Sequence, residues 1–576
     1  MLVAPMIGVI EPCIEQPPSS SPVPTSLAKH CSGVQGSAAA LVESTLQVLN
    51  KKTPGKFELG YTLPVPLLKL FVPRNGDWEI DQGMVQRLVT TIRDTQRPVI
   101  LYLFSTHFAV DAAIEEELSQ DTKNMAHTQD GPLGRDSYYA SHVYNWSVAS
   151  TENSLTDRRL QAMHAVANAI CLLKPEEKSR IRGVTLLGEI HHLFPNFQGG
   201  MGYESPYRIT DYSSISVRGF QRYLADRFDS IDRLNSTIGS NFKNFSDIQP
   251  PSKNIRETPL KQYIEHIDAF SHGTVPLSGW AFVQTPQSNF KPKVLVHLNG
   301  QLIGKATVKL NRQDVLSARP EFGYANTGWR YDLEYHRLPI GIHRLDFLLE
   351  DKPGHTVFMG TRNIAVMDRY QNTPRQAPSL PAPRASSKFT NNIFHIDQPH
   401  DQAAYYYNPL SVLWHGFRAK QITNYLHYID GQLTNSCLAD VPRYTHQIVP
   451  FLNPSWDATR FSIEDSLRPQ SKIRLGASLY GEAAYGESFH SWLDRHGVQR
   501  YGITEFHPLK PMSTDELRVI FEKHAAKGAQ FLSFFLEPEW EGQRLPRGHN
   551  IFSFDPLNKQ FGSDVLYRST QKTLGH

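Results

Sequence analysis

The feature that most constrains the fold is a strand–helix–strand rhythm that stops in mid-chain and then resumes. Continuous apolar runs such as Pro98–Ser105 and Gly183–Ile190 are followed by segments with helical spacing. Runs of this kind suit strands that are buried on both faces, as in parallel sheets. Similar runs return late in the chain, at Ile473–Tyr480 and Tyr501–Phe506. The pattern predicts an α/β fold, a (β/α)₈ TIM barrel interrupted by an insertion.

The block between the two barrel parts has the pattern of an all-β domain. From about Val275 to Met367 short alternating segments follow one another without a convincing helix, and Asn299-Gly300 is a strong hairpin signal. We interpret this block as a β-sandwich. The predicted organisation is an N-terminal flank and helix (1–54), a first barrel part (55–262), an inserted β-sandwich (270–370), a Pro-rich linker (371–392) and a second barrel part (393–576).

The numbering of the barrel strands is uncertain by one, because one segment too many qualifies. Phe57–Leu63, Leu67–Val72 and Ile393–Asp397 are all counted as candidate strands, and Ile473–Tyr480 fits either a barrel strand or an extra hairpin. Residues 111–155 are polar, with scattered aromatics and glycines. Long loops of this kind in compact domains are usually functional or mobile.

Composition excludes several classes of partner. A net charge of +3 with 20% charged residues gives no electrostatic reason to expect nucleic acid. Since no apolar stretch approaches about 18 residues, we expect no membrane-spanning helix. Met1–Ile10 lacks Lys and Arg and makes a poor signal peptide. The expected location is therefore the cytoplasm, or the periplasm or exterior if the export signal is absent from this sequence.

The cysteines give no sign of a metal site. There are four of them, Cys13, Cys31, Cys171 and Cys437, and their spacing fits no metal-binding pattern. Cys171 lies in an apolar helical run, which predicts a buried thiol. Cys13 and Cys31 share the N-terminal flank and could pair. We predict neither a metal nor another cofactor.

Two glutamates stand out as candidate catalytic groups, because each follows or ends an apolar strand. Glu189 follows the apolar run Val184–Leu187 and is separated from it by Gly188. Glu505 directly follows Tyr501–Thr504. A glutamate that is merely exposed or ion-paired at the barrel rim is the alternative for each. Cleaving a glycosidic bond requires two carboxyl groups across the bond, and in a barrel they come from the carboxyl ends of different strands. The two glutamates lie in opposite halves of the predicted barrel and could converge.

This layout resembles the large clan of (β/α)₈ retaining glycoside hydrolases, whose catalytic carboxylates are on strands four and seven. The stretches Gly219–Phe228, Ile231–Asn235 and Asn241–Pro251 resemble the matching part of glycoside hydrolase family 42, the β-galactosidases. This detailed resemblance covers a short part of the chain. It implies a retaining mechanism with Glu189 as acid/base and Glu505 as nucleophile.

The sequence departs from that clan at one informative position. The clan usually has Asn immediately before the acid/base glutamate, where it contacts the sugar 2-hydroxyl, whereas this chain has Gly188. Either another side chain takes that role, or the substrate differs at that hydroxyl, so the resemblance does not extend to galactosidase activity. The inserted sandwich also departs from the family, and resembles small β-domains that accompany exopolysaccharide enzymes.

Further residues at or after strand ends are candidates for binding substrate. They are Asp77, Trp78, His107, His191, Tyr444, His446, Tyr480, Glu482, Glu537 and Trp540, with His395 and Asp397 as additional strand-end residues. Each has the alternative of a core or rim residue whose hydrogen bonds are satisfied. Glu482 and Glu537 are the main rivals to Glu505. A zinc site built from His191, His192 and His107 lacks the paired spacing that zinc sites show.

The predicted function is cleavage of O-glycosidic bonds in a polysaccharide or oligosaccharide, with a bacterial exopolysaccharide among the candidates. Two alternatives remain open: a non-catalytic carbohydrate-binding or scaffold protein on a degenerate barrel, and a transglycosylase. A retaining pair of carboxyl groups should lie about 5–5.5 Å apart and an inverting pair about 6.5–9.5 Å apart. The only predicted partner is the carbohydrate substrate, and the oligomeric state stays open.

Overall fold

The fold is taken from a computed structural model of the whole chain. It describes residues 1–8, 10–15, 37–50, 56–106, 111–138, 141–203, 206–284, 290–369, 378–382, 384, 391–468, 472–537 and 550–575. The chain divides into two compact units: unit 1 comprises 1–198, 419–449 and 463–576, and unit 2 comprises 199–418 and 450–462.

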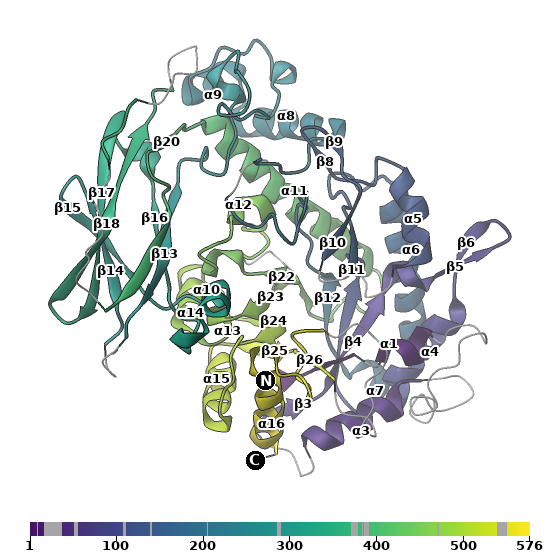
Figure 1. Cartoon of the computed structure of the whole chain (residues 1–576). Helices are drawn as coiled ribbons and strands as arrows, with labels where there is room; N and C mark the ends of the chain where they lie inside the picture. Colours follow the sequence, from purple (N-terminus) through teal and green to yellow (C-terminus); the bar gives the residue numbers. More distant parts are fainter. Residues whose placement is uncertain are drawn as a thin grey trace. The chain divides into compact units, whose positions relative to one another are not determined.

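Unit 1 contains a closed parallel barrel (Figure 1). Its strand segments fall into eight positions, because four positions are each interrupted by a few residues. In chain order the positions are β1 (Leu2–Val3) with β2 (Met6–Ile7), β3 (Glu58–Leu59) with β4 (Tyr61–Pro66), β7 (Val99–Phe104), β12 (Ile181–Leu187), β21 (Arg443–Tyr444) with β22 (Gln447–Ile448), β23 (Ile473–Tyr480), β24 (Tyr501–His507), and β25 (Ala529–Leu532) with β26 (Phe535–Leu536). Each position pairs in parallel with the next, and β25 and β26 pair with β1 and β2, which closes the ring.

The barrel interior is packed with side chains rather than open. A buried cluster joins Leu2 and Ala4 of the first position to Ile100 of the third, Tyr444 of the fifth and Phe531 of the eighth. Since positions one, three and five are not neighbours in the ring, these side chains meet across the axis. This is the layered interior expected of a TIM barrel.

Helices follow the strands, as the sequence predicts. The helices of unit 1 are α1 (Ile10–Glu15), α3 (Ala39–Leu49), α4 (Gln82–Asp94), α5 (Ala113–Gln120), α6 (Ser154–Cys171), α7 (Pro175–Lys178), α13 (Glu482–Tyr485), α14 (Glu487–Arg495), α15 (Thr514–Ala526) and α16 (Ser563–Leu574). The predicted capping box of α15 is present: Ser513 accepts from the Glu516 backbone N–H, and the Glu516 carboxylate accepts from that of Ser513.

Two insertions at the carboxyl ends of the strands matter for the site. The hairpin β5 (Phe71–Arg74) and β6 (Asp77–Ile80) follows the second position. The polar stretch after β7 contains α5 and two small hairpins, β8 (His127–Thr128) with β9 (Gly131–Pro132) and β10 (Arg135–Tyr138) with β11 (Ser141–Tyr144). The predicted long loop is thus partly ordered into short hairpins.

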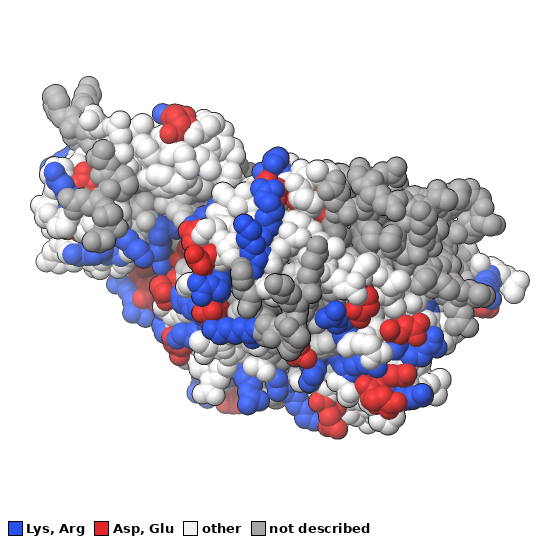
Figure 2. All heavy atoms as spheres, turned by 90° about the horizontal axis from the view of Figure 1, so that it is seen from below, with Lys and Arg blue, Asp and Glu red and all other residues white. Residues whose placement is uncertain are grey.

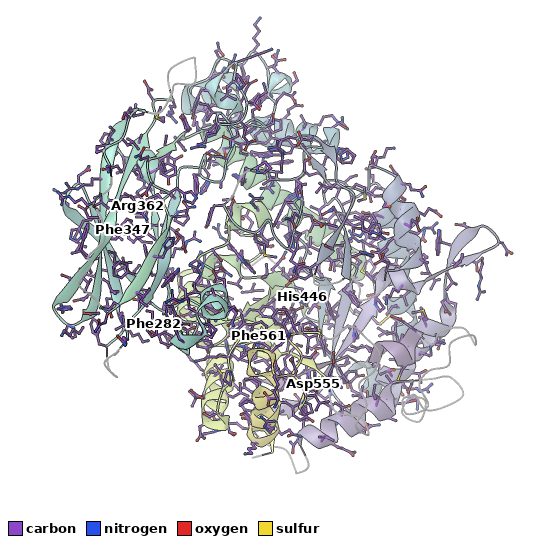
Figure 3. The ribbon with its side chains drawn as sticks, in the orientation of Figure 1. Phe282, Phe347, Arg362, His446, Asp555 and Phe561 are labelled. Atoms are coloured by element: carbon purple, nitrogen blue, oxygen red, sulfur yellow. A yellow bond between two sulfur atoms is a disulfide. The ribbon has the colours of Figure 1, made fainter. Side chains whose placement is uncertain are left out.

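Unit 2 contains two antiparallel-rich sheets with a common core. One sheet has the order β16 (Gly328–Leu333), β13 (Val275–Phe282), β19 (Ile393–Gln398), and the other has β15 (Gln301–Thr307), β14 (Lys293–Leu298), β17 (Gly341–Lys352), β18 (His355–Val366), β20 (Ala403–Tyr405). Trp329 and Phe347 are both fully buried in this core (Figure 3). Asn299 and Gly300 both have positive φ, as the predicted hairpin turn requires.

The remaining elements of unit 2 are mainly helical. They are α8 (Ser214–Phe228), α9 (Ile231–Ile238), α10 (Gln313–Ala318) and α12 (Ala458–Phe461), and α11 (Pro409–Leu433) supplies its first residues to unit 2 and the rest to unit 1. The stretch that carries the family resemblance therefore forms α8 and α9. These helices bury Phe220, Leu224 and Leu234 in a second aromatic-rich core.

Three strand predictions are wrong, for separate reasons. Ile393–Asp397 belongs to β19, which pairs with β13 in unit 2 and not with the barrel. Leu67–Val72 splits into a short 3₁₀ turn and β5, which forms a hairpin. The missing barrel strand is Leu2–Ile7, which the sequence analysis placed in the flank. Two candidate segments thus lie outside the barrel and one barrel strand was missed, so the list of candidates had one segment more than the eight positions of the barrel.

The prediction of a buried Cys171 thiol is also wrong. Cys171, the last residue of α6, forms a disulfide with Cys437, and the two positions are separated by 266 residues in the sequence. The helical pattern around Cys171 is real, but the cysteine lies at the end of the helix, where it is partly exposed. Cys31 lies outside the described residues, so its pairing with Cys13 stays a prediction.

On the face shown in Figure 2, basic and acidic side chains are interspersed. Among the described helices, none is both long and apolar enough to cross a membrane.

Candidate active site

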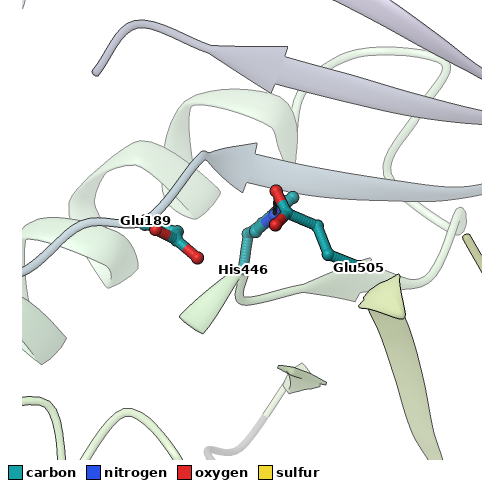
Figure 4. Close-up of side chains that lie close together, drawn as sticks. All are labelled: Glu189, His446 and Glu505. Atoms are coloured by element: carbon teal, nitrogen blue, oxygen red, sulfur yellow. Dashed lines mark hydrogen bonds and ion pairs between the residues drawn. The ribbon is translucent and has the colours of Figure 1, made fainter. Parts of the chain in front are cut away.

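The structure brings Glu189 and Glu505 together at the carboxyl ends of two barrel strands (Figure 4). Glu189 follows β12, the fourth strand position, and Glu505 lies in β24, the seventh. One carboxylate oxygen of each and a ring nitrogen of His446 all lie within 4.8 Å of one another. Two acids more than three hundred positions apart in sequence therefore face each other across a short gap.

Glu505 has two hydrogen-bond partners, one from the fifth and one from the sixth strand position. The Tyr480 hydroxyl at the end of β23 donates to Oε2 at 2.5 Å, and His446 Nε2 lies 3.0 Å from Oε1. His446, which is labelled in Figure 3, lies between β21 and β22. Its ring stacks on that of Tyr102, and the two ring centroids are 4.4 Å apart. Both oxygens of this buried carboxylate are thus fixed in direction. Such an arrangement favours the ionised form, since donors stabilise negative charge.

The backbone before Glu189 has an unusual conformation. Leu187 and Gly188 both have positive φ, at 62° and 88°. A Cβ atom at position 188 would lie 2.9 Å from Thr106 Oγ1 and 3.1 Å from Tyr102 Oη, so the position has no room for a side chain. A side chain at this position would require Thr106 or Tyr102 to move.

Glu189 has a different electrostatic environment from that of Glu505. Removal from water raises the pKa of Glu189 to about 8, the negative charge of Glu505 adds to the rise, and the Ser478 hydroxyl opposes it. The side chain is half-buried, at the boundary between the carboxylate pair and solvent. A carboxyl group with this pKa is protonated at neutral pH and can donate a proton.

An aromatic pocket adjoins Glu189, and Glu505 is not among its lining residues. Its lining residues are Thr106, Tyr138, Val143, Tyr144, Trp146, Val148, Arg159, Glu189, Ile190, His191, Leu193 and Phe197. Most come from the insertion after β7 and from the loop after β12. Tyr144 stacks on Trp146, and His191 stacks on Phe197. Flat apolar rings beside a proton donor suit the C–H faces of a sugar.

The side chains of Glu189, His446 and Glu505 could in principle also bind a metal ion. Glu189, His446 and Glu505 offer three ligand atoms within reach of one ion. Metal-bound histidines almost always donate a hydrogen bond from the other ring nitrogen. Among the described residues His446 Nδ1 has no hydrogen-bond partner. Its Nε2 is already directed at Glu505, which favours proton chemistry at this site over metal binding.

Three of the predicted binding residues belong to the site, namely His446, Tyr480 and His191. Tyr444 does not, because its ring is part of the barrel core and its hydroxyl accepts from Arg474. Asp77 and Trp78 lie in the β5–β6 hairpin (Figure 1), where Asp77 forms an ion pair with Arg158 and the Trp78 indole N–H donates to Glu117.

The two rivals of Glu505 have other surroundings. Glu482 begins the short helix α13 and accepts from the Ser488 hydroxyl. Glu537 follows β26, where it accepts from the Ser553 hydroxyl at 3.2 Å. His107 and Trp540 lie outside the described residues, and His395 and Asp397 lie in unit 2 with β19.

Several residues of the site were not singled out in the sequence. Ser478 and Tyr102 are inward-facing residues of β23 and β7, and a polar group inside an apolar run is the signal that could have identified them. Tyr138, Tyr144 and Trp146 come from the polar insertion. The polar pattern of residues 111–155 is typical of a functional or mobile loop, but spacing along the chain does not show which of its aromatics line the pocket beside Glu189.

The solved structures to which this chain is similar include several glycosidases, at low sequence identity and low TM-score. Neither the scan of family models nor the search of curated proteins found a match. Among solved structures, the chain is similar to the catalytic domain of β-amylase from Paenibacillus polymyxa (12% identity, 92% of each chain, TM-score 0.43). It is also similar to β-galactosidase from the psychrophilic Marinomonas ef1 (10% identity, TM-score 0.45), covering 99% of this chain and 58% of that one.

A third similar structure is the apo exo-carrageenase GH42 from Bacteroides ovatus (9% identity, 88% of this chain and 48% of that one, TM-score 0.42). The chain thus spans about half the length of this protein and of the Marinomonas enzyme. Likeness at these scores carries no argument about activity or family. The barrel itself is established by the closed ring of strand pairs.

Proposed function

We propose that this protein is a retaining glycosidase acting on a polysaccharide or oligosaccharide, with Glu505 as nucleophile and Glu189 as acid/base. The observation that carries the proposal is the short separation of two carboxylates with opposite surroundings. One oxygen of each carboxylate lies within 4.8 Å of the other, which supports the short spacing of carboxyl groups typical of retaining enzymes, about 5–5.5 Å. The raised pKa of Glu189 and the two partners of Glu505 support the assignment of roles.

In the first step a Glu505 carboxylate oxygen attacks the anomeric carbon and forms an ester bond. The glycosidic carbon–oxygen bond breaks, and the leaving oxygen takes the proton of Glu189. In the second step the Glu189 carboxylate accepts a proton from water, whose oxygen attacks the anomeric carbon. The ester bond breaks, and Glu505 leaves as a carboxylate. Both glutamates return to their starting protonation states.

The alternative of a non-catalytic scaffold is disfavoured by the same geometry. A degenerate barrel has no reason to keep two carboxyl groups close together, because like charges in a desolvated site cost free energy unless one is protonated. Transglycosylation uses the same residues, with a sugar in place of water in the second step. The two reactions differ in what occupies the acceptor position.

The test is a screen of defined glycans with the wild-type protein and single variants. We expect Glu189→Gln and Glu505→Gln to lose activity, and Glu537→Gln, the main rival, to retain it. NMR of the first-formed product should show the anomeric configuration of the substrate. Wild-type turnover in both Glu189→Gln and Glu505→Gln, or an inverted product, would overturn the proposal.

A further inference from the structure

The barrel ring is joined least extensively between its fourth and fifth strand positions. At this junction β12 and β21 pair in parallel only at residues 184–185 and 443–444. Every other junction of the described ring pairs at three or more positions. Because paired residues supply the main-chain hydrogen bonds between strands, we expect the ring to open first between β12 and β21.

The chain also makes a long excursion at this junction. Between β12 and β21 it passes through residues 199–418, the main part of unit 2, and returns to unit 1 along the later residues of α11. The entropic cost of bringing two strands together rises with the length of the connection between them. The pairing of β12 with β21 therefore depends on interactions at the junction itself.

The disulfide between Cys171 and Cys437 crosses this junction. Cys171 ends α6, the last long helix before β12, and Cys437 lies between α11 and β21. The bond therefore links the two segments that lead into the amino ends of β12 and β21. The Cys437 backbone N–H also donates to Cys171 Sγ at 3.2 Å. A covalent bond thus reinforces the junction at which the fewest residues are paired.

The candidate active site lies at the other ends of the same two strands. Glu189 follows β12, whereas His446, whose Nε2 lies beside Glu505, follows β21. Near the site the junction is spanned by the Gln447 side chain, which donates to the Ile190 carbonyl at 2.7 Å. A shift of β12 against β21 would therefore move the proposed acid/base relative to the proposed nucleophile.

We propose that the Cys171–Cys437 disulfide is a redox-sensitive crosslink of this junction, and that its reduction lowers activity by loosening the position of Glu189 against Glu505. The effect on activity rests on the proposed function, whereas the effect on the junction does not. Cys437 is an exposed residue, so we expect its sulfur to be the one that a reductant attacks.

Reduction should loosen the junction without unfolding the barrel. The Tyr425 hydroxyl of α11 forms hydrogen bonds with Thr156 Oγ1 at 2.8 Å and with Arg159 Nη1 at 3.0 Å, both on α6. These contacts do not depend on the disulfide, so α6 and α11 stay together when it is broken.

A dithiol reductant breaks the bond by thiol–disulfide exchange. One thiolate attacks the sulfur of Cys437, forms a mixed disulfide and releases Cys171 as a thiolate. The second thiolate of the reductant attacks the mixed disulfide, releases Cys437 and leaves the reductant as a disulfide. Two electrons and two protons pass from the reductant to the two cysteines. Since disulfides persist in oxidising compartments, the crosslink would stay intact in the periplasm or outside the cell.

The experiment reduces the folded wild-type protein with dithiothreitol and identifies the freed thiols by alkylation and mass spectrometry. Hydrogen exchange then measures the junction without any substrate. We expect exchange in residues 181–190 and 438–448 to rise on the order of tenfold after reduction, while residues 501–507 of β24 stay protected. On the substrate found by the glycan screen, kcat should fall about 10–100-fold, because small misplacements of catalytic groups are costly. Reoxidation should restore both.

Two double variants separate this disulfide from the other cysteines. Cys171→Ser with Cys437→Ser should match the reduced protein from the start and should not respond to dithiothreitol. Cys13→Ser with Cys31→Ser is the matched control, and it should keep the full response because the crosslink is intact. If the first variant folds poorly, the reduced wild type still provides the test, since it folds before the bond is broken.

Unchanged exchange at the junction, in protein whose Cys171 and Cys437 are both alkylated, would overturn the proposal. So would failure of the two cysteines to react after dithiothreitol, or faster exchange with an unchanged kcat. Failure of the proposed function has a different signature. In that case the oxidised protein would cleave no glycan, or Glu505→Gln would be as active as the wild type, while exchange at the junction would still rise on reduction.

Discussion

Glu189 and Glu505 are the same side chain at the ends of two strands of one barrel, but their surroundings differ. Glu505 is buried, with a tyrosine hydroxyl on one oxygen and a histidine nitrogen on the other. Glu189 is half-buried against an aromatic pocket, where removal from water raises its pKa and the charge of Glu505 adds to the rise. The comparison shows how a protein gives two identical acids different roles: donors keep one ionised, and desolvation keeps the other protonated.

The strongest way to break this comparison is to remove the proposed nucleophile. We expect Glu505→Ala to lose activity on the order of 10⁴-fold or more, because without an attacking carboxylate no glycosyl-enzyme forms. The loss should be independent of the leaving group. Labelling wild-type protein with 2-deoxy-2-fluoroglycosyl fluorides, followed by mass spectrometry of peptides, should identify Glu505. Labelling of Glu537 or Glu482 instead would contradict the assignment.

Removing the acid should have an effect that depends on the substrate. Glu189→Gln should lose about 10²–10⁴-fold on disaccharides, whose leaving groups need a proton. On aryl glycosides with acidic phenols, formation of the glycosyl-enzyme should be nearly unaffected, as measured by the burst of phenol. Wild-type kcat/KM on disaccharides should fall as pH rises through about 8, when Glu189 loses its proton. An unchanged basic limb in the variant would show that another group is responsible.

The hydrogen bond from Tyr480 tests how Glu505 is kept ionised. Tyr480→Phe should lower kcat about 10–100-fold, as for one hydrogen bond to a charged group. Since the donor stabilises the carboxylate, its loss should raise the pKa of Glu505 and move the acidic limb of the pH profile to higher pH. Tyr485→Phe, on the neighbouring helix α13, is the control and should leave the profile unchanged.

The lack of space for a side chain at position 188 can be tested by comparing alanine substitutions at two glycines, Gly188 and Gly497. Gly188→Ala adds a methyl group in contact with Thr106 and Tyr102 at positive φ, whereas Gly497→Ala adds one at positive φ in open space. We expect Gly497→Ala to cost about 1–2 kcal/mol of unfolding free energy. Gly188→Ala should cost about 1–3 kcal/mol more and should reduce activity. Equal unfolding midpoints in urea would show that the two neighbours can move away.

The smallest expected effect is on stability and follows from the same pKa. Because folding raises the pKa of Glu189 above its ordinary value of 4.5, the folded state binds the proton more tightly. This contribution is present below pH 4.5 and is lost as pH rises towards 8. Glu189→Gln cannot ionise, so its Tm should exceed that of the wild type at pH 9 but not at pH 4. The same Tm difference at both values would contradict the pKa.

The parts of the fold that could be predicted were those with regular local patterns. The helices α4 and α15 begin and end close to the predicted positions, because amphipathic spacing and capping residues are local signals. Ile393–Gln398 is also a strand, but no local pattern shows which sheet it joins. Leu2–Ile7 was missed because its strand segments are only two residues long, too short to show a period.

In the candidate site, too, the residues with a local sequence signal could be predicted and the others could not. Glu189 and Glu505 could be predicted because a charged residue at the end of an apolar strand conflicts with its surroundings. Tyr444, also a candidate binding residue, lies in the barrel core two positions before His446, which contacts Glu505. The partners of Glu505 and the rings around Glu189 depend on how the ring of strands closes, and this cannot be read from spacing along the chain.

The strand position formed by β1 and β2, which closes the barrel, makes the ring sensitive to changes at a few residues. Leu2–Val3 and Met6–Ile7 fill the gap between the second and the eighth strand positions, so the earliest and some of the latest parts of the chain complete one ring. Substitutions that stop Leu2–Val3 or Met6–Ile7 from pairing, such as a proline at Val3, would open the ring and leave two unpaired edges, which invite association between copies.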